Sequence, residues 1–248
     1  MRNPNGQDGL PEIVLRVPGS WSGPESLGRA LPQGHRYAGG RLYLPGGDDV
    51  EVIPLPPDDE FPRVFEGACR RLPSRRDRRT IESYGVNVCL AGPGGSLEAA
   101  IRMLMAGAAV VQAGGAGVFV DNSGRAHPSR DWIDLADSPD DSDAYQAFVS
   151  LFAGKTDLWS VGMHVFGLCD AVIKRGDDDE SACFDITSFL GYTMLPDVVI
   201  ADGDYAGDYE GSPPRFLLRK EATTFPPPGS PLHNPYGRWR LDPMRVSP

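Results

Sequence analysis

The chain has 248 residues, a length that suits one main domain with an extension, because single hydrophobic cores stop growing at roughly 250 to 300 residues. Its formal charge is −10, and the whole excess lies in residues 91 to 248, which hold 22 acidic residues against 12 Lys and Arg. Such a surface repels nucleic acid and anionic membranes and attracts a basic protein. We therefore expect a protein partner, no nucleic acid and no membrane.

The sequence contains no run that approaches the roughly 20 apolar residues of a membrane span. Its first nine residues are polar and glycine-rich, unlike a signal peptide, so we expect a cytoplasmic protein. The four cysteines are widely spaced and form no CxxC pair. Neither a zinc site nor a disulfide framework is predicted, and no cofactor is expected.

The first 72 residues predict short strands followed by one helix. The apolar runs at 13–17, 41–44 and 50–55 are typical of strands. Apolar residues recur every three or four positions from 58 to 72, which predicts a helix. We expect residues 1 to 57 to form a β-rich extension or arm, and residues 58 to 248 to form the main domain with a proline-rich tail.

Residues 70 to 79 hold six arginines and one aspartate. The favoured interpretation is a solvated helix C-terminus and loop, where cations complement the helix dipole. A patch that binds phosphate or acidic groups is the alternative. Binders of single-stranded nucleic acid require aromatic residues between the arginines, and this segment has none.

The clearest unit is a strand, a helix and a strand over residues 84 to 121. Val86, Val88 and Leu90 alternate as in a strand, and a glycine-rich turn follows. Ser96 is a natural N-cap for a helix that runs to about residue 111, and the next strand covers 117–121. This unit predicts a crossover between parallel strands.

The second half alternates helices and strands without a strict repeat. Helices are predicted at 142–152 and 181–194, and strands at 158–166, 171–174, 198–200, 215–222 and 238–241. The aspartate-rich residues 131 to 143 are expected to form a surface connection. The predicted class is α+β, with a mixed β-sheet and helices packed on its face, built around the β-α-β unit.

An acidic loop with tyrosines follows the strand predicted at 198–200. Acids at its first and third positions and a glycine at its sixth are similar to a calcium loop, but Ala206 and Pro213 stand where ligands belong. No metal site is therefore predicted. Tyrosine and tryptophan are enriched at protein interfaces, so the candidate partner-binding residues are Trp132, Asp134, Asp202, Asp204, Tyr205, Asp208 and Tyr209.

Two other features are weighed as catalytic or ligand sites. The turn with Gly94, Gly95 and Ser96 precedes a helix, where backbone N–H groups can hold phosphate, but it lacks the Walker lysine. A plain tight turn is favoured. His164 is expected to be a half-buried strand residue, and a functional role would pair it with Asp170 or Asp185.

Several segments together resemble an uncharacterised bacterial family, domain of unknown function 4261, over roughly residues 84 to 220. They are residues 96–100, 117–120 with 123–124, Trp132 and residues 161–170, in that order. The resemblance implies a bacterial intracellular αβ domain without an established activity, so it supplies no catalytic residues.

Two function classes remain open. The first is a non-catalytic module, such as an immunity-type or adaptor protein, that docks a basic partner through an acidic face. The second is a hydrolase or transferase that uses the turn at 92–96 or a metal at the loop 202–208. Whether the chain is an enzyme is left undecided by the sequence.

Overall fold

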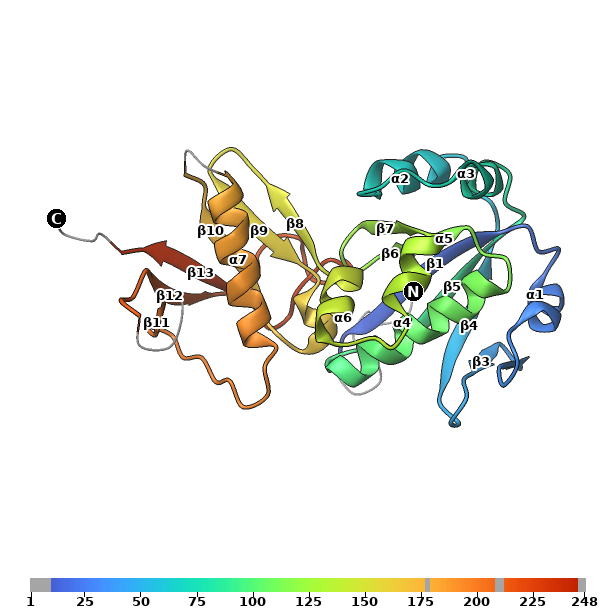
Figure 1. The fold of residues 1–248 in the computed structure, drawn as a ribbon, viewed down its shortest axis with the longest axis horizontal. Coiled ribbons are helices and arrows are strands. Elements are labelled where there is room, and N and C mark those ends of the chain that lie inside the picture. The colour runs from blue at the N-terminus through green and yellow to red at the C-terminus, as the bar shows by residue number, and fades with distance from the viewer. Residues whose placement is uncertain (1–9, 177–178, 208–211, 245–248) are drawn as a thin grey trace.

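The computed structural model describes residues 10–176, 179–207 and 212–244, and its fold is α+β. Two β-sheets follow one another along the long axis of the molecule, with helices packed on their faces (Figure 1). None of the helices in these ranges is both long enough and apolar enough to cross a membrane.

The N-terminal half of the chain builds a seven-stranded sheet in which all neighbouring strands are antiparallel. Its strands are β1 (Glu12–Gly19), β2 (Arg36–Ala38), β3 (Arg41–Tyr43), β4 (Asp49–Leu55), β5 (Val86–Pro93), β6 (Gly117–Val120) and β7 (Arg125–Pro128). The order across the sheet is β2-β3-β4-β5-β1-β6-β7. The segment expected to be an extension or arm thus supplies four strands, and three of them, β1, β3 and β4, lie inside the sheet.

The unit expected at residues 84 to 121 is present as β5, helix α4 (Leu97–Gln112) and β6. Ser96 caps α4 as predicted, and its hydroxyl accepts a hydrogen bond from the amide of Ala99 at 3.1 Å. β5 and β6 are both antiparallel to β1, so they are parallel to each other as expected. They are not neighbours, because β1, with Ile13, Leu15 and Val17 fully buried, fills the place between them.

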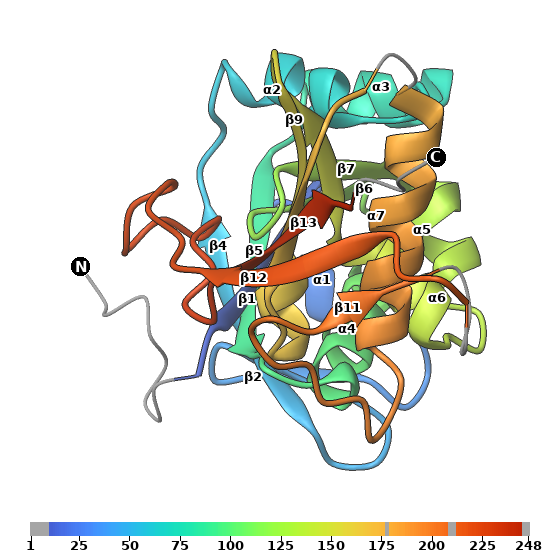
Figure 2. The ribbon, with the colours of Figure 1, turned by 90° about the vertical axis from the view of Figure 1, so that its left-hand side faces the viewer.

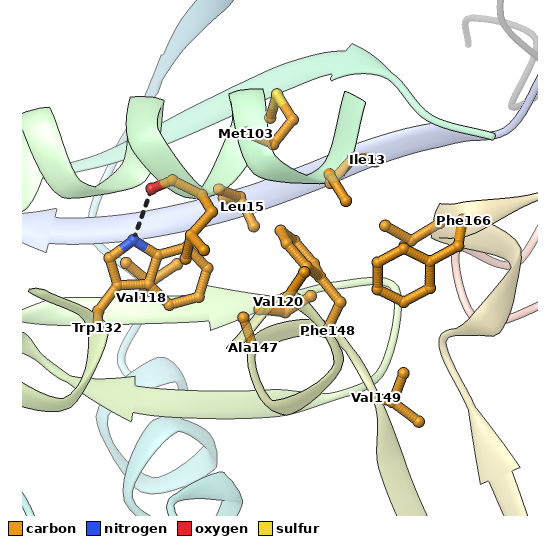
Figure 3. Packing of buried hydrophobic residues seen from close by; sticks show 14 of the residues in the cluster. Ile13, Leu15, Met103, Val118, Val120, Trp132, Ala147, Phe148, Val149 and Phe166 are labelled. Atoms are coloured by element: carbon orange, nitrogen blue, oxygen red, sulfur yellow. Dashed lines mark hydrogen bonds between the residues drawn. The ribbon is translucent and has the colours of Figure 1, made fainter. Parts of the chain in front are cut away.

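Helix α4 lies on one face of this sheet and contributes ten buried residues. Trp132 packs against it so closely that its indole nitrogen donates to the carbonyl of Leu104 at 3.0 Å (Figure 3). Gly107 makes this approach possible, since a Cβ there would lie 2.8 Å from the same nitrogen. Trp132 belongs to helix α5 (Ser129–Leu135), so residues expected to form a surface connection instead bury a large aromatic ring.

A chain of aromatic rings extends this core toward the second sheet. Trp132 meets Phe148 edge to face at 5.9 Å between ring centroids, and Phe148 meets Phe166 in the same way at 6.3 Å (Figure 3). Phe148 ends helix α6 (Asp141–Phe148), and Phe166 ends the short 3-10 helix η1 (Met163–Phe166). The buried hydrophobic residues of the two sheets form one continuous cluster.

Helices α2 (Phe61–Ala68) and α3 (Arg75–Glu82) cover the opposite face of the seven-stranded sheet (Figure 1). They enclose a smaller cluster around Phe61, Phe65 and Ile81. Helix α1 (Pro24–Ala30) lies near β2. Much of the arginine-rich segment expected to be a loop is therefore the helix α3, which Ser74 caps by accepting from the amide of Asp77 and which Ile81 fixes to the core.

The C-terminal half builds a six-stranded sheet in the order β11-β12-β13-β10-β9-β8. Its strands are β8 (Ser150–Ala153), β9 (Asp157–Val161), β10 (Asp170–Lys174), β11 (Tyr205–Ala206), β12 (Phe216–Glu221) and β13 (Arg238–Pro243). β10 and β13 are parallel, and all other neighbours are antiparallel. Helix α7 (Asp179–Thr193) packs against β9 and β10.

Two strand predictions in this half are wrong. The segment 158–166 divides into β9 and η1, because Gly162 has a positive φ of 121° that ends the extended chain. Residues 198 to 200 form no strand, and the side chain of Val199 is 90 % exposed. An apolar triplet alone does not distinguish a buried strand from an exposed loop.

Candidate functional site: a groove beside helix α7

A groove with a volume of about 760 Å³ lies between α7, β11, β12 and the loop around residues 199 and 200. We call it the α7–β11 groove. Figure 2 shows β11 and β12 beside the helix. The floor is apolar and buried, with Phe189 from α7 and Phe216 and Leu218 from β12. The sheet and the helix therefore hold the groove in place without any contribution from the side chains at its mouth.

The mouth of the groove carries large apolar side chains that face solvent. Phe184 and Tyr192 lie two turns apart on α7 and are 68 % and 55 % exposed. Val199 and Tyr205 complete the rim from the facing loop and strand and are similarly open. A contiguous exposed apolar patch of this kind marks a binding surface more often than scattered exposed residues do.

The groove lies in an acidic stretch of the chain. Residues 176 to 214 include ten Asp and Glu and no Lys, Arg or His. At one wall Asp185 forms a bidentate ion pair with Arg215, with N–O distances of 2.8 and 2.9 Å. The Arg215 guanidinium also lies over the ring of Phe216, 5.1 Å from its centroid. Among the described residues, the one cation in this wall is thus paired with the carboxylate of Asp185.

The predicted acidic residues Asp202 and Asp204 lie on the loop that leads into β11. Asp202 accepts a hydrogen bond from the backbone amide of Lys220, and Asp204 accepts one from that of Ala201, both at 2.7 Å. Both residues are exposed, and Tyr205 and Asp204 line the groove. The two carboxylates therefore shape the loop and carry charge at the surface.

Two of the predicted partner-binding residues, Asp208 and Tyr209, lie outside the described residues. Within the described ranges, no group of three or more His, Cys, Asp or Glu side chains could hold a metal ion. The carboxylates of Asp202 and Asp204 instead accept from backbone amides.

Trp132 and Asp134 do not join this groove. Trp132 is fully buried against α4, so the expectation that it contacts a partner is wrong. The neighbouring aspartates predict a surface segment, but on the same helix Asp134 is exposed while Trp132 is buried. Asp134 is exposed and lies 3.7 Å from Arg130, on a helix that packs on the seven-stranded sheet.

The glycine-rich turn is a structural junction rather than a phosphate cradle. The amide of Gly94 donates to the carbonyl of Pro11, and that of Gly95 donates to the carbonyl of Val165, both at 2.8 Å. Ser96 is occupied as the cap of α4. With these donors already engaged, the alternative site at Gly94, Gly95 and Ser96 loses the groups that would bind phosphate.

His164 and Asp170 are both buried, and neither contacts the other. The ring Nε2 of His164 lies 3.1 Å from the side-chain Nδ2 of Asn122. Burial lowers the pKa of His164 to about 4. Asp170 accepts from Ser160, the amide of Met163 and Asn234, and burial raises its pKa to about 7. The expected strand position of His164 is also wrong, since it belongs to η1.

The exposed aromatic residues of α7, Phe184 and Tyr192, are not among the predicted partner-binding residues. Their signal is the spacing of Phe184, Ser188 and Tyr192 every four residues, on the face opposite Ile186 and Leu190. A helix with apolar residues on both faces is expected to pack one face on the core and to leave the other for a binding partner.

No protein-family model, curated protein or solved structure matches the chain. The resemblance to domain of unknown function 4261 therefore stays a prediction.

Proposed function

We propose that the protein is a non-catalytic binding module that holds a basic segment of a partner protein in the α7–β11 groove. The observation that carries the proposal is the coincidence of exposed aromatic side chains with a stretch that has ten acids and no cation. Aromatic anchors supply most of the affinity at protein interfaces. Complementary charge supplies the rate of association and the choice of partner.

The partner segment that fits has an apolar or aromatic anchor flanked by Lys or Arg. The anchor would fill the space between Phe184, Tyr192 and Tyr205. The flanking cations would lie over Asp202 and Asp204, whose carboxylates also accept from the backbone amides of Lys220 and Ala201. An adaptor and an immunity-type protein are both forms of this role.

A displayed library of random peptides tests the proposal directly. We expect selection on the purified protein to enrich peptides with aromatic or aliphatic anchors next to Lys or Arg. The double variant Phe184→Ser/Tyr205→Ser should weaken binding of the selected peptides by about a hundredfold, because it removes two exposed anchors worth about 1 to 2 kcal/mol each.

The matched control is Leu72→Ser/Phe225→Ser, which removes two apolar side chains that are 71 % and 80 % exposed elsewhere. It should bind like the native protein. Asp202→Asn/Asp204→Asn keeps an oxygen acceptor for each amide and should slow association and flatten its salt dependence. Equal losses in the groove and control variants, or selection of acidic peptides, would refute the groove as the binding surface.

A further inference from the structure

Arg125 is the one arginine among the described residues that is buried, with 9 % of its surface exposed. It lies on β7, at the edge of the seven-stranded sheet, and donates through Nη1 to the carbonyl of Val149. Its Nε is buried without a hydrogen-bond partner. No carboxylate within the described ranges pairs with it.

This arrangement is an exception in the molecule. All the half-buried arginines that the structure describes have a carboxylate oxygen within 3.2 Å: Arg16, Arg41, Arg78, Arg102, Arg175, Arg215, Arg238 and Arg240. The chain has 34 acidic residues, so carboxylates are plentiful. A buried cation is costly unless it is paired, which leaves Arg125 without the compensation that the less buried arginines receive.

A second cation lies beside it. Cys69 forms a parallel β-bridge with Ala126, which brings the segment that carries Arg70 next to β7. The charge of Arg70 adds to burial in lowering the pKa of Arg125 to about 10, so the two guanidinium groups repel each other. Arg70 is exposed and has no ion pair within the part of the chain that the structure describes.

The charge of Arg125 also acts on Tyr145 and His127, and neither of these groups is an anion. The hydroxyl of Tyr145 is buried near Thr187 without a hydrogen bond of normal geometry, and burial raises the pKa of Tyr145, so the hydroxyl keeps its proton. His127 lies on the same face of β7 as Arg125, and its Nε2 contacts the carbonyl of Ala147 at 3.0 Å. Burial lowers the pKa of His127 to about 3, which leaves it neutral.

We infer that Arg125 and Arg70, with the hydroxyl of Tyr145, bind an anionic group of the phosphate or carboxylate class at the edge of β7. A planar guanidinium with an unused Nε is suited to a two-point contact with either group. The bound anion would neutralise both cations. The residues involved are not among those that line the α7–β11 groove, so this site does not depend on the proposed function.

The test measures the binding of sodium phosphate and of sodium succinate to the full chain by thermal shift. The Tm in each salt is compared with the Tm in sodium chloride of equal ionic strength. One of the two anions should raise Tm beyond chloride, because a ligand of the folded state stabilises it. Phosphate binding alone would identify the phosphoryl class, and succinate binding alone the carboxylate class. Arg70→Gln should weaken the binding by about tenfold or more, as expected for a lost charge-assisted hydrogen bond.

The matched control is Arg79→Gln, which removes an exposed arginine from the same arginine-rich segment. It should keep the affinity of the native protein. Arg125→Met should fold, since it removes an unpaired buried charge, and should abolish the response. Failure of both anions to exceed chloride, or equal losses in Arg70→Gln and Arg79→Gln, would overturn the inference, and Arg70→Gln decides it even if Arg125→Met does not fold.

Discussion

At the scale of single residues, Asp170 shows how burial can outweigh hydrogen bonding. Three donors, from Ser160, the amide of Met163 and Asn234, point at its carboxylate and favour the charged form. Removal from water costs the charged form more, so the pKa rises to about 7 instead of falling. Near neutral pH, Asp170 is therefore poised between its two forms at the start of β10.

This shift predicts how stability depends on pH. The unfolded chain loses the Asp170 proton near pH 4 and the folded chain near pH 7, so the free energy of unfolding should fall as pH rises through that interval. The slope from this group reaches about 1.4 kcal/mol per pH unit. Asp170→Asn cannot ionise, so its stability relative to the native protein should increase from pH 5 to pH 7.5 in urea unfolding.

The comparison with the variant is needed because two histidines act in the opposite direction. Burial lowers the pKa values of His127 and His164 to about 3 and about 4. Between those values and about pH 6.5 these histidines are protonated in the unfolded chain but not in the folded one, so the free energy of unfolding rises with pH. These contributions are common to both proteins and cancel in the difference. A difference that stays constant with pH would contradict the assignment to Asp170.

At the scale of elements, α4 depends on its cap. Ser96→Ala removes the bond to the amide of Ala99 and should lower the free energy of unfolding by about 1 kcal/mol in urea titration. Ser142→Ala in α6 is the control, because its contact to Gln146 is long at 3.4 Å, and it should change stability little. Binding of phosphate should be the same in both variants, since the turn before α4 offers no free cradle. A loss of phosphate binding in Ser96→Ala alone would restore the rejected site.

Local sequence patterns predicted the helices and strands better than they predicted which strands pair with one another. The apolar run at 13–17 predicted β1, the alternation at 86–90 predicted β5, and Ser96 with the residues after it predicted α4 and its cap. The insertion of β1 between β5 and β6 could not be predicted, because pairing partners more than 60 residues apart leave no local signal. Trp132 was misplaced for a related reason, as its buried face is decided by Gly107 on another helix.

The candidate site was predicted in part. Asp204 and Tyr205 do line the groove, because an acidic, tyrosine-bearing loop after an apolar segment is visible in the sequence. The face of α7 that opposes them could not be identified without knowing which side of that helix the sheet covers. The unpaired state of Arg125 was likewise hidden, since ion pairing is a property of the folded chain.

At the scale of the whole molecule, the two sheets share one core. The cluster that begins with Ile13 on β1 continues through Phe148 and Phe166 to Leu241 on β13. The turn before α4 adds a direct bond, from the amide of Gly95 to the carbonyl of Val165. Two packed halves with a common core are expected to unfold together.

The prediction is a single cooperative transition in which calorimetric and van't Hoff enthalpies agree. Trp21 lies with the first sheet and Trp239 in the second, so each can report on one half when the other tryptophans are replaced by Phe. Their fluorescence midpoints should coincide. Separate midpoints would mean that the sheets are independent units.

The position of β1 has a consequence for synthesis. This strand leaves the ribosome before either strand that flanks it, and its second neighbour is complete only about a hundred residues later. Until then Ile13, Leu15 and Val17 have no sheet to join, and these apolar side chains are exposed to solvent in the nascent chain. Closure of the long loop back to β6 should set the pace of folding, as it does wherever distant contacts dominate.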